Sequence, residues 1–269
     1  MSQQATVEVS SEQALTISQE SGVTVWQMNL PHLRNPLSVE LKTAFAENIE
    51  IFANDPTQRV LVITGKDAAF CAGGDLRTMD STPGTVATRE RMHMSHSFVR
   101  RFTRVEKPII MAVNGAAVGA GSSLAMLGDI IVASESAYFA AGFPRVGVLP
   151  DLGLLWTLPR VIGLARAKDF VLSNRNYTAQ EALQINMVSR VLPDEGFLDQ
   201  VKELAASIAR GPGVSLGLSK LMMDTGLSDT LDAYLLREEM AQAVVFGTDD
   251  FLEGTRAFRE KRKPVFAGR

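Results

Sequence analysis

The stretch NGAAVGAGSSLA, residues 114–125, places three glycines and two serines between an apolar run and a segment of small residues. The run before it, PIIMAVN at 108–114, predicts a buried strand because it is short and apolar. Residues 119–127 predict a closely packed helix. A strand, a glycine loop and a helix in this order leave the first helical N–H groups open, and an anion can approach them where the residues are glycine and alanine.

A nucleotide phosphate does not fit this loop. A phosphate-binding loop of the Walker type needs lysine after its last glycine, but Gly121 is followed directly by Ser122. The three glycines Gly115, Gly119 and Gly121 also lack the G-x-G-x-x-G spacing that binds dinucleotides. Both nucleotide interpretations therefore fail on missing residues.

A second glycine loop, CAGGD at 71–75, follows another predicted strand, VLVIT at 60–64. Two backbone N–H groups from separate loops that meet at one oxygen form an oxyanion hole, which stabilises a charge that develops only during a reaction. Spacing alone favours a simpler interpretation, in which both loops are tight strand-to-helix turns.

The chain is predicted to be an α/β protein with a helical C-terminal region. The order strand, glycine loop, helix occurs at 60–80 and again at 109–133, which indicates stacked β/α turns. Ser38 is predicted to cap a helix with an apolar stripe of Leu41, Phe45, Ile49 and Phe52, and 85–107 to form another helix. We divide the chain into a polar N-terminal tail (1–13), a core (14–195) and a helical region (196–269).

Composition excludes several classes of function. The 269 residues are 46% hydrophobic with a net charge of −3, which argues against a nucleic-acid partner. A single cysteine, Cys71, suits a reducing compartment, and neither a secretion signal nor an apolar stretch long enough for the membrane is present. His93 and His96 stand on one predicted helix face without a third ligand, so no metal site is predicted. The sequence thus predicts a cytoplasmic protein without a membrane partner.

Four stretches together resemble the crotonase family, the enoyl-CoA hydratase/isomerase superfamily. They are FCAGGDL (70–76), KPIIMAVNGAAVGAGSSLAMLGDIIVAS (107–134), VGVLPDLGLLWTLPRVIGLARAKDFVLS (146–173) and FREKRKPVF (258–266). The resemblance implies a crotonase-like spiral of ββα turns whose C-terminal helices build homotrimers or hexamers. It also implies an acyl-CoA substrate, with coenzyme A as part of the thioester and no permanently bound cofactor.

By the same resemblance, the backbone N–H groups of Gly74 and Ala120 would hold the oxygen of a thioester enolate. Hydratases of the family use two glutamates, whose positions here carry Ser123 and Phe143, so simple hydration is in doubt. Asp151 matches an aspartate that dienoyl-CoA isomerases and the phenylacetate-pathway epoxyacyl-CoA isomerases use for proton transfer. Without the resemblance, the position of Asp151 after a proline and before an apolar run favours a helix N-cap, and the two roles are compatible.

Six further residues are predicted to contact the substrate: Ala72 and Arg34 beside the coenzyme, Lys261 near its adenosine end, and Ser123, Phe143 and Trp156 around the acyl group. Each also has a structural interpretation. The basic run around Lys261 can be a solvated face, the two aromatic residues can belong to the core, and the serine can bond its own helix.

We therefore expect an enoyl-CoA isomerase-type proton transfer. An alternative is a hydratase or lyase that activates water with Asp151, alone or with Ser123. A second alternative is a non-catalytic member that binds acyl-CoA or serves as a scaffold.

Overall fold

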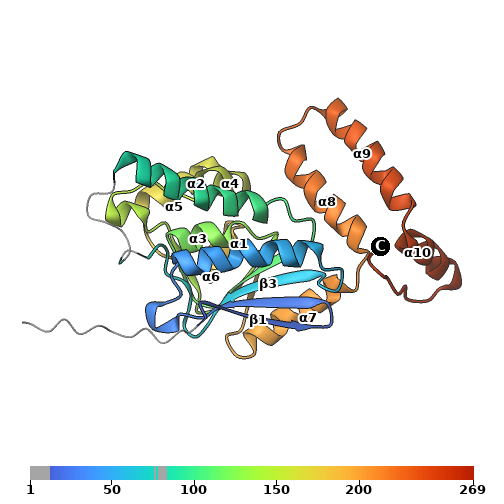
Figure 1. Ribbon diagram of the computed structural model, residues 1–269, viewed down its shortest axis with the longest axis horizontal. Helices are drawn as coiled ribbons and strands as arrows, with labels where there is room; N and C mark the ends of the chain where they lie inside the picture. Colours follow the sequence, from blue (N-terminus) through green and yellow to red (C-terminus); the bar gives the residue numbers. More distant parts are fainter. Residues whose placement is uncertain (1–12, 76, 78–83) are drawn as a thin grey trace, which may run out of the picture.

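The computed structural model describes residues 13–75, 77 and 84–269, so the predicted tail lies outside it except for Gln13. Its strands form two sheets (Figure 1). The larger sheet has the order β1 (Leu15–Glu20), β2 (Val23–Met28), β3 (Val60–Gly65), β5 (Ile109–Val113), β7 (Ile130–Ser134), β10 (Arg190–Leu192). The smaller has the order β4 (Ala69–Cys71), β6 (Ala116–Val118), β8 (Tyr138–Ala140), β9 (Tyr177–Thr178).

Successive strands enter the two sheets alternately, which makes the chain a spiral. β3, β5 and β7 join the larger sheet, and β4, β6 and β8, each next in the chain, join the smaller one. Helix α2 (Thr85–Phe102) follows the first of these strand pairs and α3 (Ala120–Ala125) follows the second. Only β1 with β2 and β8 with β9 pair antiparallel among the described strands. The predicted α/β spiral of ββα turns is confirmed.

The two faces of the larger sheet are covered by different helices. In β3, Val60 and Val62 face one apolar cluster, while Leu61 and Ile63 face the other, as alternation along a strand requires. The first cluster is closed by α7 (Phe197–Ala209), and the second contains buried residues of α1 (Val39–Asn54), α2 and α3. Figure 1 shows α1 and α2 on one side of the sheet and α7 on the other. The predicted region 196–269 thus begins with a helix packed on the core sheet.

Local predictions for α1 are confirmed and one for α2 is wrong. The Ser38 side chain accepts a hydrogen bond from the Leu41 N–H, and the predicted apolar stripe is the buried face of α1. The helix predicted at 85–107 ends at Phe102. Lys107 precedes Pro108, and a residue before proline is disfavoured in a helical conformation. Its ammonium group instead donates to the carbonyl oxygens of Phe52 and Asp55, at 2.6 and 2.7 Å.

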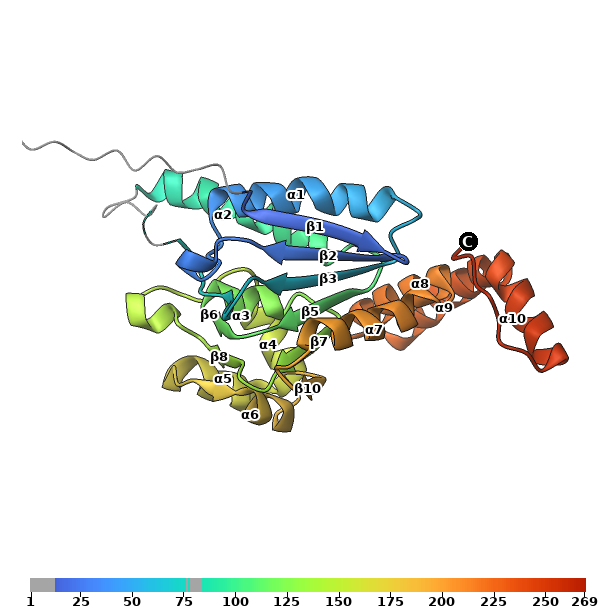
Figure 2. The same cartoon turned by 90° about the horizontal axis from the view of Figure 1, so that it is seen from below.

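The remaining helices fall into two groups. The short helices η1 (Pro31–Leu33) and η3 (Phe143–Val146) and the helices α4 (Leu154–Ile162), α5 (Leu164–Ser173) and α6 (Ala179–Gln184) belong to the core. The helices α8 (Gly213–Gly226), α9 (Leu231–Phe246) and α10 (Asp249–Glu260) project away from it (Figures 1 and 2). A 2.8 Å ion pair between Lys220 of α8 and Asp129 fastens this projection to the sheet. In the described ranges, no helix has the length and apolarity needed to cross a bilayer.

Candidate active site

The two glycine loops meet at the start of α3. A Cβ atom on Gly121 would stand 2.1 Å from the carbonyl oxygen of Cys71, so only glycine lets α3 lie this close to β4. Gly73 has φ +106°, and a Cβ there would lie 2.9 Å from the oxygen of Val118 and 3.6 Å from the nitrogen of Ala120. Loop 71–75 therefore packs directly against the segment that leads into α3.

Replacement of Gly121 by alanine tests this close packing. Its Cβ would meet backbone, which cannot move aside as a side chain can, so we expect Gly121→Ala to lower the free energy of unfolding by about 3 kcal/mol. Denaturant unfolding followed by circular dichroism measures the loss. Gly254→Ala in α10 is the matched control, because its nearest neighbour would lie at an ordinary 3.5 Å. Equal stabilities of the two variants would contradict this account of the contact.

The backbone N–H groups of Gly74 and Ala120 donate none of the hydrogen bonds found among the described residues outside the helices and strands. Ala120 is the first residue of α3, and Gly74 forms an isolated bridge with Leu37 in which the Leu37 N–H donates to the Gly73 oxygen at 2.8 Å. That the two share one substrate oxygen stays a prediction.

Asn35, a buried residue that the sequence analysis did not single out, fixes the segment 66–69 that leads into β4. Asn35 is 0% exposed with φ +54°, a conformation that asparagine tolerates better than most residues. Its amide donates to the oxygens of Lys66 and Ala69 at 2.9 and 2.8 Å, and its own oxygen accepts from Leu30. Arg34, just before it, accepts a 2.9 Å bond from the Ala72 N–H. The structure thus brings together two of the predicted coenzyme contacts.

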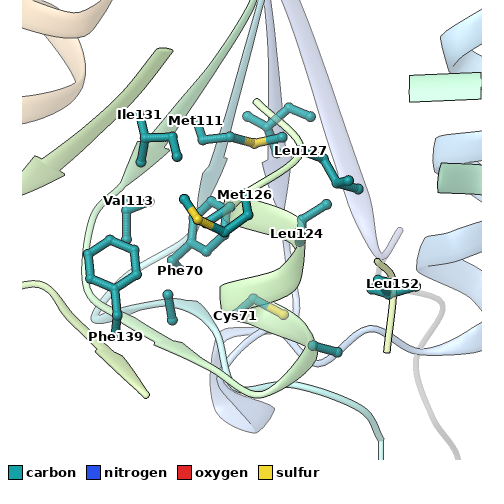
Figure 3. Packing of buried hydrophobic residues seen from close by; sticks show 14 of the residues in the cluster. Phe70, Cys71, Met111, Val113, Leu124, Met126, Leu127, Ile131, Phe139 and Leu152 are labelled. Atoms are coloured by element: carbon teal, nitrogen blue, oxygen red, sulfur yellow. The ribbon is translucent and has the colours of Figure 1, made fainter. Parts of the chain in front are cut away.

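Asp151 occupies a tight turn between η3 and α4. The next residue, Leu152, is 3% exposed and has φ +51°, and Gly153 is the N-cap of α4. The alternative that Asp151 caps this helix is therefore wrong. Figure 3 shows Leu152 in the same buried cluster as Leu124 of α3 and Cys71. Its burial holds Asp151 at the edge of the core that surrounds the glycine loops.

The environment of Asp151 suits a group that takes up and releases a proton. Burial is the largest influence and raises the pKa of its carboxyl group, while the positive charges of Lys42, Arg91 and His96 act against that rise. Its Oδ1 atom is buried and has no hydrogen-bond partner among the described residues. A carboxylate with a raised pKa and an unsatisfied oxygen is chemically suited to act as a base.

The same burial makes ionised Asp151 unfavourable for stability. Its pKa is higher in the folded than in the unfolded chain, so stability falls as the pH rises from the ordinary 3.8 through the raised value. We expect Asp151→Asn to raise the melting temperature at neutral pH and to change it little below pH 3.8. Thermal unfolding at both pH values measures this, with the exposed Asp199→Asn as control. A lower melting temperature of Asp151→Asn at neutral pH would refute it.

Ser123 and Phe143 lie inside the molecule near these loops. Ser123 is 0% exposed in α3, and its Oγ lies 3.4 Å from the Gly119 oxygen, which matches the bond to its own helix that the sequence left open. Phe143 begins η3 and belongs to the apolar cluster that contains Ala120. Neither side chain carries an acid, so Asp151 is the candidate base among the predicted residues.

Trp156 and Lys261 are both exposed, and Lys261 lies away from the glycine loops within one chain. Trp156 is 56% exposed on α4, and the guanidinium carbon of Arg160 lies 3.8 Å from its ring centroid. Lys261 is exposed at the end of α10, and both views place α10 away from α3 (Figures 1 and 2). The predicted contact of Trp156 with the acyl group stays a prediction, and a contact of Lys261 with coenzyme A at the same glycine loops would need a second copy of the chain.

The family model described as enoyl-CoA hydratase/isomerase matches residues 18–269. The chain belongs to the enoyl-CoA hydratase/isomerase family. It is 38% identical over 255 residues to the 1,2-epoxyphenylacetyl-CoA isomerase of Escherichia coli, covering 93% of this chain and 97% of that one. It is 34% identical over 248 residues to a probable enoyl-CoA hydratase of Rhodobacter capsulatus, covering 92% and 95%.

The fold of this enoyl-CoA hydratase/isomerase member agrees with solved structures. The crystal structure of an enoyl-CoA hydratase from Bacillus anthracis superposes with a TM-score of 0.91 at 29% identity, covering 96% of this chain and all of that one. The chain is thus a crotonase-superfamily enzyme that acts on acyl-CoA thioesters. Relatives with isomerase and with hydratase names both occur, so the type of reaction has to be argued from the site.

Proposed function

We propose that this protein is an enoyl-CoA isomerase-type enzyme that moves a double bond or opens a strained ring next to the thioester. In the double-bond shift, Asp151 removes a proton from the α-carbon of a β,γ-unsaturated acyl group, and the electron pair moves onto the thioester oxygen as a dienolate. The N–H groups of Gly74 and Ala120 stabilise this oxygen. The enolate then collapses as Asp151 returns the proton to another carbon, so no water or second acid is consumed.

The observation that carries the proposal is the Asp151 carboxylate, the one acid among the predicted site residues. It is partly buried and has an unsatisfied oxygen, while Ser123 and Phe143 supply no second carboxylate for activating water. One group that both removes and returns a proton suits an isomerisation better than a hydration. The 38% identity to an isomerase supports the same choice.

The proposed assembly is a homotrimer or a hexamer in the cytoplasm, built through α8–α10. In that arm, α9 has no buried residue, which leaves a large apolar surface for another copy. The most exposed apolar side chains of the arm are Met223, Leu227, Leu231, Leu236, Met240, Val244, Phe246, Leu252 and Phe258. In such an assembly Lys261 would bind coenzyme A in a neighbouring copy, where Arg34 and Ala72 would also contact it.

A hydratase is the second candidate, supported by the hydratase names among the relatives. It would use Asp151, alone or with Ser123, to activate water. A non-catalytic acyl-CoA binder would keep the fold and the coenzyme contacts without proton transfer.

Incubation in deuterated water separates these possibilities. We expect an acyl-CoA thioester to exchange its α-protons for deuterium, and an enoyl-CoA to give a product of unchanged composition apart from deuterium. Mass spectrometry measures both. A product that has gained a water molecule would show a hydratase, and tight binding without any exchange would show a binder.

A further inference from the structure

Two positive side chains, Lys42 and Arg91, and the imidazole of His96 act on the Asp151 carboxylate and take no part in the proton transfer proposed above. Lys42 lies on α1, and Arg91 and His96 lie on α2. Their effect on the Asp151 carboxylate decreases in the order Lys42, Arg91, His96. His96 is exposed, whereas Lys42 and Arg91 are partly buried. The two strongest of these influences therefore come from side chains that are partly buried.

The register of both helices places these two side chains on the inner side. Arg91 stands one turn before Ser95, which begins the buried face of α2. Lys42 stands about one turn before Phe45 and two turns before Ile49, both on the buried face of α1. Both charges thus lie at the ends of apolar stripes that run into the core, where an ionised group needs a partner.

No partner within the described residues satisfies this cluster. Two buried side-chain atoms of the cluster, Arg91 Nε and Asp151 Oδ1, lack a hydrogen-bond partner among the described residues. None of the close ion pairs found in the ranges 13–75 and 84–269 includes Lys42, Arg91 or Asp151. Partly buried charges without partners are unfavourable, which indicates that a ligand completes the cluster.

The charge balance shows what kind of ligand fits. Two cations face one carboxylate, and Glu40, the other acid that acts on Lys42, is exposed and the weakest of its influences. A permanent negative charge on the ligand would balance the site. The planar fork of an arginine matches a carboxylate with two parallel hydrogen bonds, and a lysine can complete the contact.

We propose that Lys42 and Arg91 bind a carboxylate at the far end of the acyl group, so that the preferred substrate is a mono-CoA thioester of a dicarboxylic acid. This inference rests on the proposed function only in placing the acyl group beside Asp151. Burial and the neighbouring Arg91 lower the pKa of Lys42, and a bound carboxylate would favour its protonated form.

Binding of unreactive ligands tests the proposal without any need for turnover. Saturated acyl-CoA thioesters of increasing chain length are titrated calorimetrically in pairs that end in a carboxylate or in a methyl group. At the chain length that reaches Arg91, we expect the carboxylate-ended ligand to bind at least about tenfold more tightly than its methyl-ended partner. No such preference at any chain length would overturn the proposal.

Variants then identify the residues that cause the preference for the carboxylate-ended ligand. Arg91→Met and Lys42→Met are each expected to reduce the ratio of the two affinities severalfold, whereas Arg91→Lys keeps part of it. The exposed Arg89→Met on the same helix is the matched control and should leave the ratio unchanged. The ratio is measured within each variant, so a general loss of folding would not alter it. A preference that survives in both methionine variants would also overturn the proposal.

The outcomes for the two proposals are separable. If α-proton exchange fails but the carboxylate preference holds, the isomerase mechanism is wrong and the binding site stands. If Lys42 and Arg91 only adjust the proton affinity of Asp151, the variants shift the pH profile of exchange without changing the affinity ratio, which contradicts the site.

Discussion

Asp151→Asn is expected to slow α-proton exchange and isomerisation by about 1,000-fold while acyl-CoA binding persists. Positioned acid–base groups contribute roughly 100- to 10,000-fold, and in the proposed mechanism a single group both takes and returns the proton. An asparagine side chain keeps the shape of the turn before α4 but has no basicity. Deuterium exchange monitored by mass spectrometry gives the rate, and calorimetric titration with a saturated acyl-CoA gives the affinity.

Two comparisons make this result specific to the site. Asp199→Asn makes the same change of charge at a side chain that is 81% exposed on α7, and should exchange at the wild-type rate. Wild-type exchange should increase with pH through a pKa above the ordinary 3.8, because only the ionised carboxylate accepts a proton. Exchange by Asp151→Asn within tenfold of wild type would exclude Asp151 as the base.

Patterns that depend on neighbours in the sequence predicted the fold well. The Ser38 cap and the apolar stripe of α1 are determined within one helix, and the short apolar run VLVIT (60–64) is the buried strand β3. The end of α2 was missed because the predicted helix ran on through Val105, whose side chain is indeed buried, but from the loop that follows. An apolar residue at helical spacing indicates that its side chain is buried. It does not indicate where the helix ends.

The site was predictable where a motif is continuous and unpredictable where helices supply single residues. The glycine loops that carry Gly74 and Ala120 could be found because each is one short segment. Lys42 and Arg91 could not, since each is a single charge in an otherwise ordinary amphipathic helix. They come together only when α1, α2 and the turn before α4 pack. Trp156 shows a different difficulty. It stands in an apolar stretch of the sequence, yet its side chain is 56% exposed on the surface.

Ala120→Pro is expected to remove one oxyanion donor while leaving α3 intact. Ala120 is the first residue of this helix, a position where proline is well tolerated because its missing N–H has no partner in the helix. The preceding Gly119 has φ +58° and ψ −124°, the mirror image of the extended conformation that a residue before proline favours, and glycine adopts either hand readily.

Loss of this donor should lower kcat about 100- to 1,000-fold with little change in KM, because the hydrogen bond strengthens as negative charge develops on the thioester oxygen. Rates are measured by deuterium exchange, and thermal unfolding verifies that the variant folds. Leu164→Pro is the matched control, since Leu164 is the first residue of α5 and follows Gly163, whose φ is also positive. That variant should retain wild-type exchange. A folded Ala120→Pro enzyme with an unchanged rate would mean that this N–H does not hold the enolate, and the glycine loop would then be a structural turn.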